Sequence, residues 1–243
     1  MGFDDDASKE KYSSEWSHGR FVDAIVKAAL NHSPPVSELP KIINLDGGAL
    51  GKIFDVLIEE TMADPHKRER SKIGKVSLEG KLIVPRKTTV GENHSVVTPI
   101  ELKISEAFLG LRKYTNQERM AFLAHTHGAI ESPPSPQDLS NILTSPDNVG
   151  SQAIFILTQN SRMMLIRTLL TPDLNRDAVK AMIDKWDLEL KIFAETIKKI
   201  FVSPDELSRQ VFQKHFEIIK RACDENHLAM YTAFGNNRYS KSN

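Results

Sequence analysis

The sequence lacks most of the features that would link it to a membrane or to an oxidising compartment. A single cysteine, Cys223, among 243 residues excludes an intrachain disulfide and any CxxC metal site. A lone thiol suits a reducing compartment, so we expect a cytoplasmic protein. No stretch approaches the ~18 consecutive apolar residues of a membrane helix, and the acidic, polar start of the chain lacks the apolar segment of a secretory signal. We therefore expect no membrane span.

An excess of either charge is also missing. Lysine and arginine together number 32 and aspartate and glutamate together number 32, so the formal net charge is zero. A protein that binds nucleic acid through its overall charge has a basic excess, so a nucleic-acid partner is not expected. Apolar residues make up 40% of the chain, which excludes a fully disordered protein and is typical of a globular one.

The first segment of the chain, 1–49, is interpreted as a leader followed by a helix. Residues 1–16 are polar and are expected to be flexible. Apolar residues at helical spacing then predict a helix over 17–31. The proline-rich stretch NHSPPVSELPK separates this helix from the next segment.

The second segment, 50–172, predicts a core of mixed helices and strands. Apolar periodicity predicts a helix over 50–63. The β-branched run IGKVSLEGKLIV, with its central Glu79-Gly80, predicts a hairpin, and SVVTPIELKI predicts a further strand. We interpret RMAFLAHTH as a buried strand, with a helix as the alternative. The runs SQAIFILT and RMMLIRTLL predict an antiparallel hairpin.

The third segment, 173–243, predicts a helical extension. An apolar stripe predicts a helix over 174–200, and Ser203 as N-cap with Pro204 at the first position predicts another that ends near residue 226. The end of the chain, GNNRYSKSN, is expected to be loose. Each stripe must be buried, either on the chain's own sheet or in a homo-oligomer or complex; we favour association. The expected fold class is α/β (α+β), a mixed sheet flanked by helices.

One short segment combines residues that can bind a metal ion. His125 and His127, two positions apart, project from the same face of a strand. Ser135 is a natural N-cap and Pro136 suits the first position of a helix, which places Asp138 in the first turn. Its carboxylate can face the strand end that carries the histidines. Two histidines and one carboxylate leave a fourth position for water, the pattern of a catalytic zinc site.

The spacing H-x-H-x7-S-x2-D resembles the JAMM motif of the MPN/JAB family of zinc metalloproteases, and all four motif positions match. The resemblance covers about 50–172 and implies an MPN/JAB-like mixed sheet. It implies that His125, His127 and Asp138 bind Zn²⁺ and that Ser135 helps to stabilise the oxyanion of the tetrahedral intermediate.

The resemblance also implies a glutamate near the start of an early strand, which acts as general base. Glu69 lies in the best position, after a helix and before the first strand. Lys72 stands where a glycine is usual, and Gly128 replaces the proline that commonly follows the two histidines. The other candidates for the base are Glu59, Glu60, Glu79 and Glu101.

The activity that the resemblance implies is hydrolysis of peptide or isopeptide bonds in a protein substrate, including removal of ubiquitin or a ubiquitin-like tag. Two alternatives remain: a non-catalytic MPN scaffold for a protein complex, and a RadC-like JAB protein in DNA metabolism, against which the zero net charge counts. A cupin site that uses Glu131 is disfavoured, because Arg119 and Asp138 replace its flanking glycines.

Overall fold

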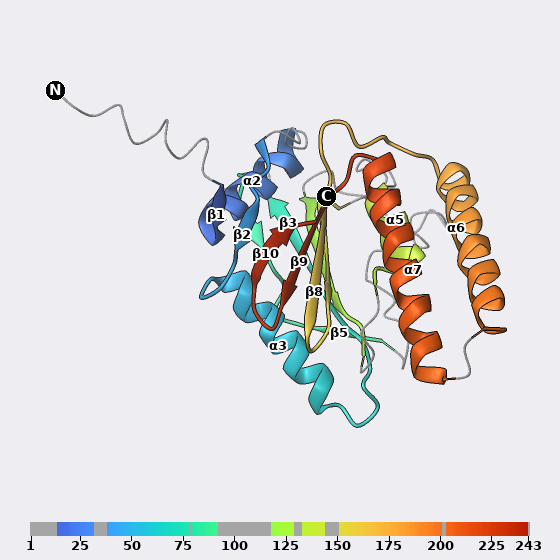
Figure 1. Ribbon diagram of the computed structural model, residues 1–243. Helices are drawn as coiled ribbons and strands as arrows, with labels where there is room; N and C mark the ends of the chain where they lie inside the picture. Colours follow the sequence, from blue (N-terminus) through green and yellow to red (C-terminus); the bar gives the residue numbers. More distant parts are fainter. Residues whose placement is uncertain are drawn as a thin grey trace, which may run out of the picture.

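The computed structural model describes residues 14–31, 38–77, 79–91, 118–128, 133–143, 151–200 and 203–242. Within these ranges the chain forms five helices and a ten-stranded mixed sheet (Figure 1). The α+β fold class predicted from the sequence is confirmed.

Helices cover both faces of the sheet (Figure 1). On one face lie α2 (His18–Asn31) and α3 (Ala49–Ala63), and on the other lie α5 (Pro136–Leu143), α6 (Arg176–Ile197) and α7 (Pro204–Glu225). The four helices predicted outside the motif segment are confirmed at these bounds. No helix in the described ranges has both the length and the apolar character that crossing a bilayer requires.

The sheet joins strands from the whole length of the chain. Their bounds are β1 Glu15–Ser17, β2 Ile42–Asn44, β3 Arg70–Ser77, β4 Leu82–Ile83, β5 Thr89–Val90, β6 Glu118–Thr126, β7 Ala153–Leu157, β8 Ser161–Ile166, β9 Ala229–Phe234 and β10 Arg238–Lys241. In space the order is β1-β2-β10-β9-β8-β7-β6-β3-β4, and β5 pairs with β3. The β1–β2 and β6–β7 pairs are parallel, and the other pairs are antiparallel.

The strands predicted around the motif are confirmed. The run RMAFLAHTH is a strand rather than a helix up to Thr126, the last residue of β6, and His127 follows directly. The antiparallel β3–β4 pair turns at Gly80, whose φ of 75° lies in the left-handed region that favours glycine. The β7–β8 hairpin is antiparallel as expected. The strand predicted for SVVTPIELKI lies outside the described residues.

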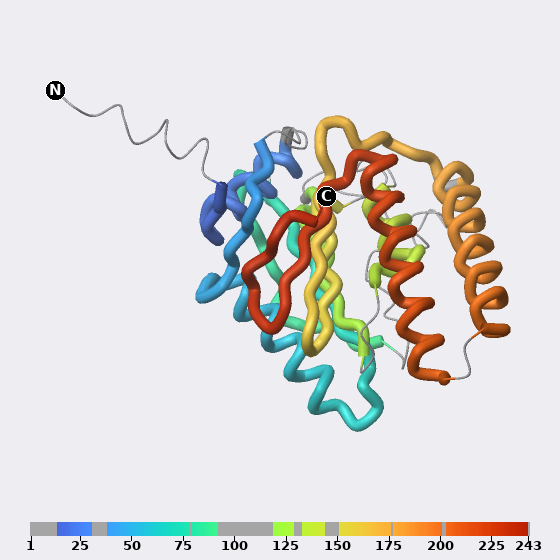
Figure 2. The backbone as a smooth tube through the Cα atoms, viewed as in Figure 1, coloured from blue at the N-terminus to red at the C-terminus, as the bar shows by residue number. Residues whose placement is uncertain are grey.

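The first and last described strands, β1 and β10, both belong to the sheet and lie on either side of β2 (Figure 2), and neither was predicted from the sequence. Trp16, placed in a flexible leader, lies in β1 and is only 6% exposed. The end of the chain, expected to be loose, forms β10, and its Tyr239 is fully buried between β2 and β9. The helical interpretation of 173–243 is therefore wrong beyond α7. Strands of three or four residues are too short to show an alternating pattern.

Two apolar layers separate the sheet from its helices. The layer under α2 and α3 is rich in aromatic rings, including Phe54, Phe122 and Phe155. The layer under α5, α6 and α7 is largely aliphatic, and the helix stripes contribute Trp186 and Ile218 to it. The stripes of α6 and α7 are thus buried within the chain, because α6 packs against α5 and α7 and α7 packs against β9.

Candidate metal centre

Strand β6 presents different side chains to the two layers. It lies inside the sheet between β3 and β7, and the backbone N–H of His127 continues the pairing by donating to the carbonyl of Leu157 at 3.0 Å. Because side chains alternate along a strand, Phe122 and Ala124 pack under α2 and α3, while Leu123 and His125 lie on the face covered by α5. The histidine pair therefore sits on the aliphatic face.

The N-terminus of α5 positions the carboxylate. The Asp138 N–H donates to Ser135 Oγ at 3.2 Å, and the Ser135 N–H donates to Asp138 Oδ2 at 2.6 Å. This reciprocal arrangement satisfies two backbone donors at the helix start, as in a capping box. Leu139 and Ile142, both fully buried, fix α5 on the sheet. The predicted N-cap at Ser135 is confirmed.

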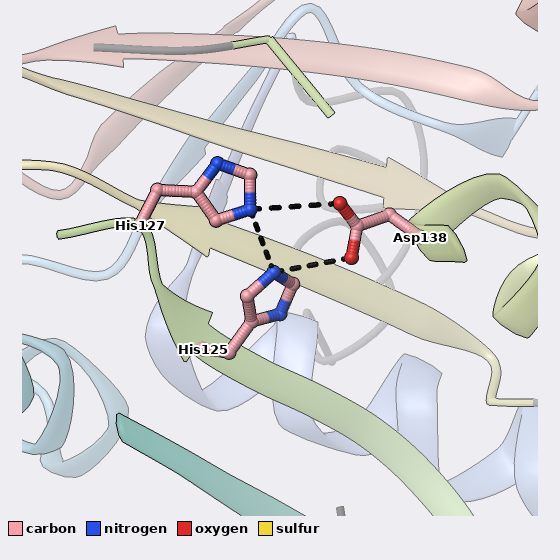
Figure 3. Close-up of side chains that lie close together, drawn as sticks. All are labelled: His125, His127 and Asp138. Atoms are coloured by element: carbon pink, nitrogen blue, oxygen red, sulfur yellow. Dashed lines mark hydrogen bonds and ion pairs between the residues drawn. The ribbon is translucent and has the colours of Figure 1, made fainter. Parts of the chain in front are cut away.

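The three predicted ligands converge (Figure 3). His125 Nε2 lies 3.1 Å from Asp138 Oδ1, His127 Nε2 lies 3.6 Å from Asp138 Oδ2, and the two Nε2 atoms are 3.0 Å apart. Ligands at ~2.0–2.1 Å from a tetrahedral zinc are about 3.3 Å from one another. The side chains of these three residues therefore fit a small cation, and all three residues are at most 9% exposed.

Electrostatics couple the carboxylate to the histidines. Burial by itself lowers the pKa of His125, but the charge of Asp138 and its hydrogen bond outweigh burial and raise that pKa. Burial raises the pKa of Asp138, yet the charges and hydrogen bonds of His125 and His127 hold it well below its usual value. Asp138 is thus an anion at neutral pH, as a cation ligand must be.

Ser135 touches the ligand set directly. Its hydroxyl donates to Asp138 Oδ2 at 2.7 Å, the same oxygen that accepts the Ser135 N–H. A hydrogen bond of this kind orients a ligand carboxylate. Donation to an oxyanion, the role that the JAMM resemblance implies, requires the hydroxyl to turn away from Asp138.

Glu69 lies on the same side of the sheet as the histidines. Ser71 on β3 is directly opposite His125 on β6, and Glu69 is two residues before Ser71, so alternation places it on the same face. Its negative charge contributes to the raised pKa of His125, which indicates proximity. The half-buried Glu69 therefore lies on the face that carries the candidate site.

The loop before Glu69 is held by buried polar contacts. Asp64, which follows α3, accepts a hydrogen bond from Arg70 Nη2 at 3.2 Å. The backbone N–H of Arg70 donates to Thr126 Oγ1 at 2.9 Å, and that hydroxyl also bonds the hydroxyl of Thr61 at 2.8 Å. Because Thr126 lies between the two histidines in sequence, these contacts fix the position of Glu69 relative to them.

Both departures from the family motif have a local structural role. A Cβ atom at Gly128 would lie 2.8 Å from the carbonyl oxygen of Lys67, so glycine permits the close approach of the loop. Lys72 points to the other face of β3, where its Nζ donates to the carbonyls of Pro85 and Arg86 at 3.0 and 2.8 Å.

Three of the other candidate glutamates lie away from the histidines. Glu59 and Glu60 are exposed on α3, which covers the opposite face of the sheet. Glu79 lies in the β3–β4 turn, at the end of β3 away from Ser71. Glu101, and the Glu131 of the cupin interpretation, lie outside the described residues.

Sequence reasoning missed one residue near the site. His215 on α7 is half-buried and lines a small cavity between α5, α6 and α7 together with Pro136. Burial lowers its pKa; the charge of Asp187 opposes this effect and that of His127 adds to it. The available signal was helical spacing: His215 shares one helix face with the buried Ile218 and Ala222.

Comparisons with protein-family models, with curated proteins and with solved structures found no match to this chain. The resemblance to the JAMM motif therefore depends on the motif residues themselves and on the way in which His125, His127 and Asp138 converge.

Proposed function

We propose that this chain is a zinc-dependent hydrolase of peptide or isopeptide bonds, of the JAMM type. The observation that carries the proposal is the buried convergence of His125, His127 and Asp138, with ligand atoms 3.0–3.6 Å apart. A buried cluster of this kind is stable as a metal site, because the cation offsets the desolvation of the carboxylate. Glu69 on the same face adds the acid–base group that hydrolysis needs.

Zinc is the metal that we propose because two imidazoles and one carboxylate leave an open position, the pattern of catalytic zinc sites. When bound, zinc would lower the pKa of a water molecule toward ~7 and polarise the scissile carbonyl. The same ligand set also suits non-haem iron. The metal analysis must therefore measure both elements.

Residues of the chain supply proton transfer and stabilise the oxyanion. Glu69 accepts the proton of the attacking water and passes it to the leaving amine. Ser135 holds the Asp138 carboxylate in the resting site and, once its hydroxyl has turned, donates to the developing oxyanion. The contacts of Thr126 to the loop before Glu69 keep the base and the ligands in one rigid unit.

The proposed substrate is a protein that carries ubiquitin or a ubiquitin-like tag, as the motif resemblance implies. A cytoplasmic setting agrees with a single thiol, Cys223, which is buried and whose pKa burial raises to about 12. Association through the C-terminal helices would use the outer face of α6, where Leu188 and Ile192 are 57% and 58% exposed.

Mass spectrometry of cleavage products tests the function. Zinc-loaded protein is incubated in ¹⁸O-water with peptides and with substrates linked through a lysine ε-amine. We expect cleavage with one ¹⁸O in the new carboxylate, loss of cleavage on chelation and recovery on adding zinc. A metal-loaded protein that cleaves none of these substrates would favour the scaffold alternative, and cleavage that survives chelation would contradict the proposal.

A further inference from the structure

Two buried polar atoms beside the candidate metal centre have no hydrogen-bond partner among the described residues: Ser71 Oγ and His125 Nδ1. Ser71 is 1% exposed and His125 is 5% exposed, so bulk water does not satisfy either atom. Buried polar atoms without a partner are rare in native proteins. Two of them on neighbouring strands therefore call for a common explanation.

The two residues are directly opposite each other in the antiparallel β3–β6 pair. Opposite residues of such a pair share a face and have Cβ atoms ~4.5–5.5 Å apart. Ser71 Oγ is one bond from its Cβ and His125 Nδ1 is two bonds from its own. Rotation of the Ser71 side chain about its Cα–Cβ bond can therefore bring Oγ toward Nδ1.

Of the two residues directly paired with His125, Ser71 is the one that offers an acceptor on its side chain. On the far side of β6 the partner of His125 is Ile156 of β7, and the same-face neighbours Ile73 and Leu123 are also apolar. Glu69 lies two residues before Ser71, beyond the end of β3, and is the general base proposed above. Ser71 is therefore the polar side chain that the register supplies to Nδ1.

The ring chemistry gives this contact a function. His125 Nε2 faces Asp138 and His127, so Nε2 is the nitrogen that would bind the metal and Nδ1 must then carry the proton. Metal-binding histidines almost always donate that second N–H to an acceptor, which fixes the tautomer and the ring orientation. We propose that Ser71 is a positioning residue whose hydroxyl accepts the Nδ1–H of His125 and so presents Nε2 to the metal. This inference rests on the proposed metal centre.

Metal affinity and a histidine NMR signal together test the role. Zinc affinity is measured by competition with a chelator for the full-length wild type, for Ser71→Ala and for Ser151→Ala. Ser151→Ala is a matched control, because Ser151 is also a fully buried serine. It lies just before β7, and its hydroxyl donates to the carbonyl of Ala153. We expect Ser71→Ala to bind zinc about 10–100-fold more weakly and Ser151→Ala to bind as the wild type does.

The NMR signal separates orientation from packing. In zinc-loaded protein with ¹⁵N-labelled histidine, His125 should show a slowly exchanging Nδ1–H, and Ser71→Ala should shift it upfield and speed its exchange. An unchanged signal overturns the role, even if affinity falls, because packing alone would then be responsible. Wild-type protein that takes up no metal overturns both this role and the proposed function, whereas equal affinity of wild type and Ser71→Ala overturns only the role.

Discussion

The two faces of the sheet are made by the same strands but differ in the side chains that they bury. Under α2 and α3, Phe122 packs edge-to-face on Phe54 and Phe155, with ring centroids 6.2 and 5.7 Å apart. On the opposite face, under α5, the aliphatic layer is interrupted by the polar side chains of His125 and Asp138. Both faces bury an apolar layer, and the face under α5 also carries the buried cluster of His125, His127 and Asp138.

The difference shows how a rigid strand can serve chemistry. Since neighbouring residues of β6 point in opposite directions, Phe122 anchors the same backbone that presents His125. The aromatic core on one face of β6 therefore fixes the backbone that carries the site, and the polar side chains of the site do not enter that core. Substitutions on the aromatic face should change stability and leave metal binding intact, whereas substitutions of the three ligands should abolish metal binding.

The largest expected effect is on turnover. Glu69→Gln removes the proposed general base and keeps all three ligands, so kcat should fall about 10²–10⁴-fold while zinc content stays unchanged. Steady-state kinetics beside metal analysis measure the two quantities. Glu79→Gln, in the exposed β3–β4 turn, is the control and should keep wild-type kcat. Full turnover in Glu69→Gln would show that another group is the base.

On the aromatic face, Phe122→Ala should reduce the free energy of unfolding by about 3–5 kcal/mol, because it leaves a cavity in a close-packed layer. Urea denaturation measures this loss. At a temperature where the variant is folded, its zinc affinity should match that of the wild type. A parallel fall in affinity would mean that the two faces are not independent.

The site should also respond to pH in opposite directions with and without metal. The pKa of His125 is raised above 6.5 in the metal-free protein, so its stabilising contribution is complete below pH 6.5 and is lost as the pH rises through the raised value. Zinc binds the neutral imidazole, so its affinity should rise over the same range. The Asp138 contribution is lost only as the pH falls below 3.8.

Denaturation at a series of pH values around neutrality measures this reversal. Metal-free protein should lose stability on going from mildly acidic to mildly basic pH, and protein in excess zinc should gain it. In His125→Ala the metal-free slope should become flatter. The same slope with and without zinc would argue against a metal at His125.

The smallest effect is expected at the outer surface. Leu188→Lys with Ile192→Lys should change the free energy of unfolding by less than about 0.5 kcal/mol per substitution, because both side chains are exposed. If copies associate through α6, light scattering should show that the variant has lost the wild-type assembly. Point substitutions are used because a chain cut near Pro172 would lose β9 and β10 from the interior of the sheet. Wild-type protein that is monomeric at high concentration would end the association hypothesis.

The candidate site was predictable because its ligands belong to one short segment with local signals. The spacing of His125 and His127 needs only a strand, and the position of Asp138 needs only the N-cap at Ser135. The sheet's outer strands were not predictable in this way, since β10 pairs with β2 across almost the whole chain. The position of Ser71 opposite His125 was not predictable either, because it depends on the register of two strands that are distant in the sequence.

Metal content is the measurement that tests the central claim most directly. Purified wild-type protein and the double variant His125→Ala with His127→Ala are each dialysed against zinc, and then against metal-free buffer, before plasma emission analysis for zinc and iron. The account predicts about one zinc per wild-type chain and almost none in the double variant, with folding of both verified by circular dichroism. Equal metal content in the two proteins would contradict it.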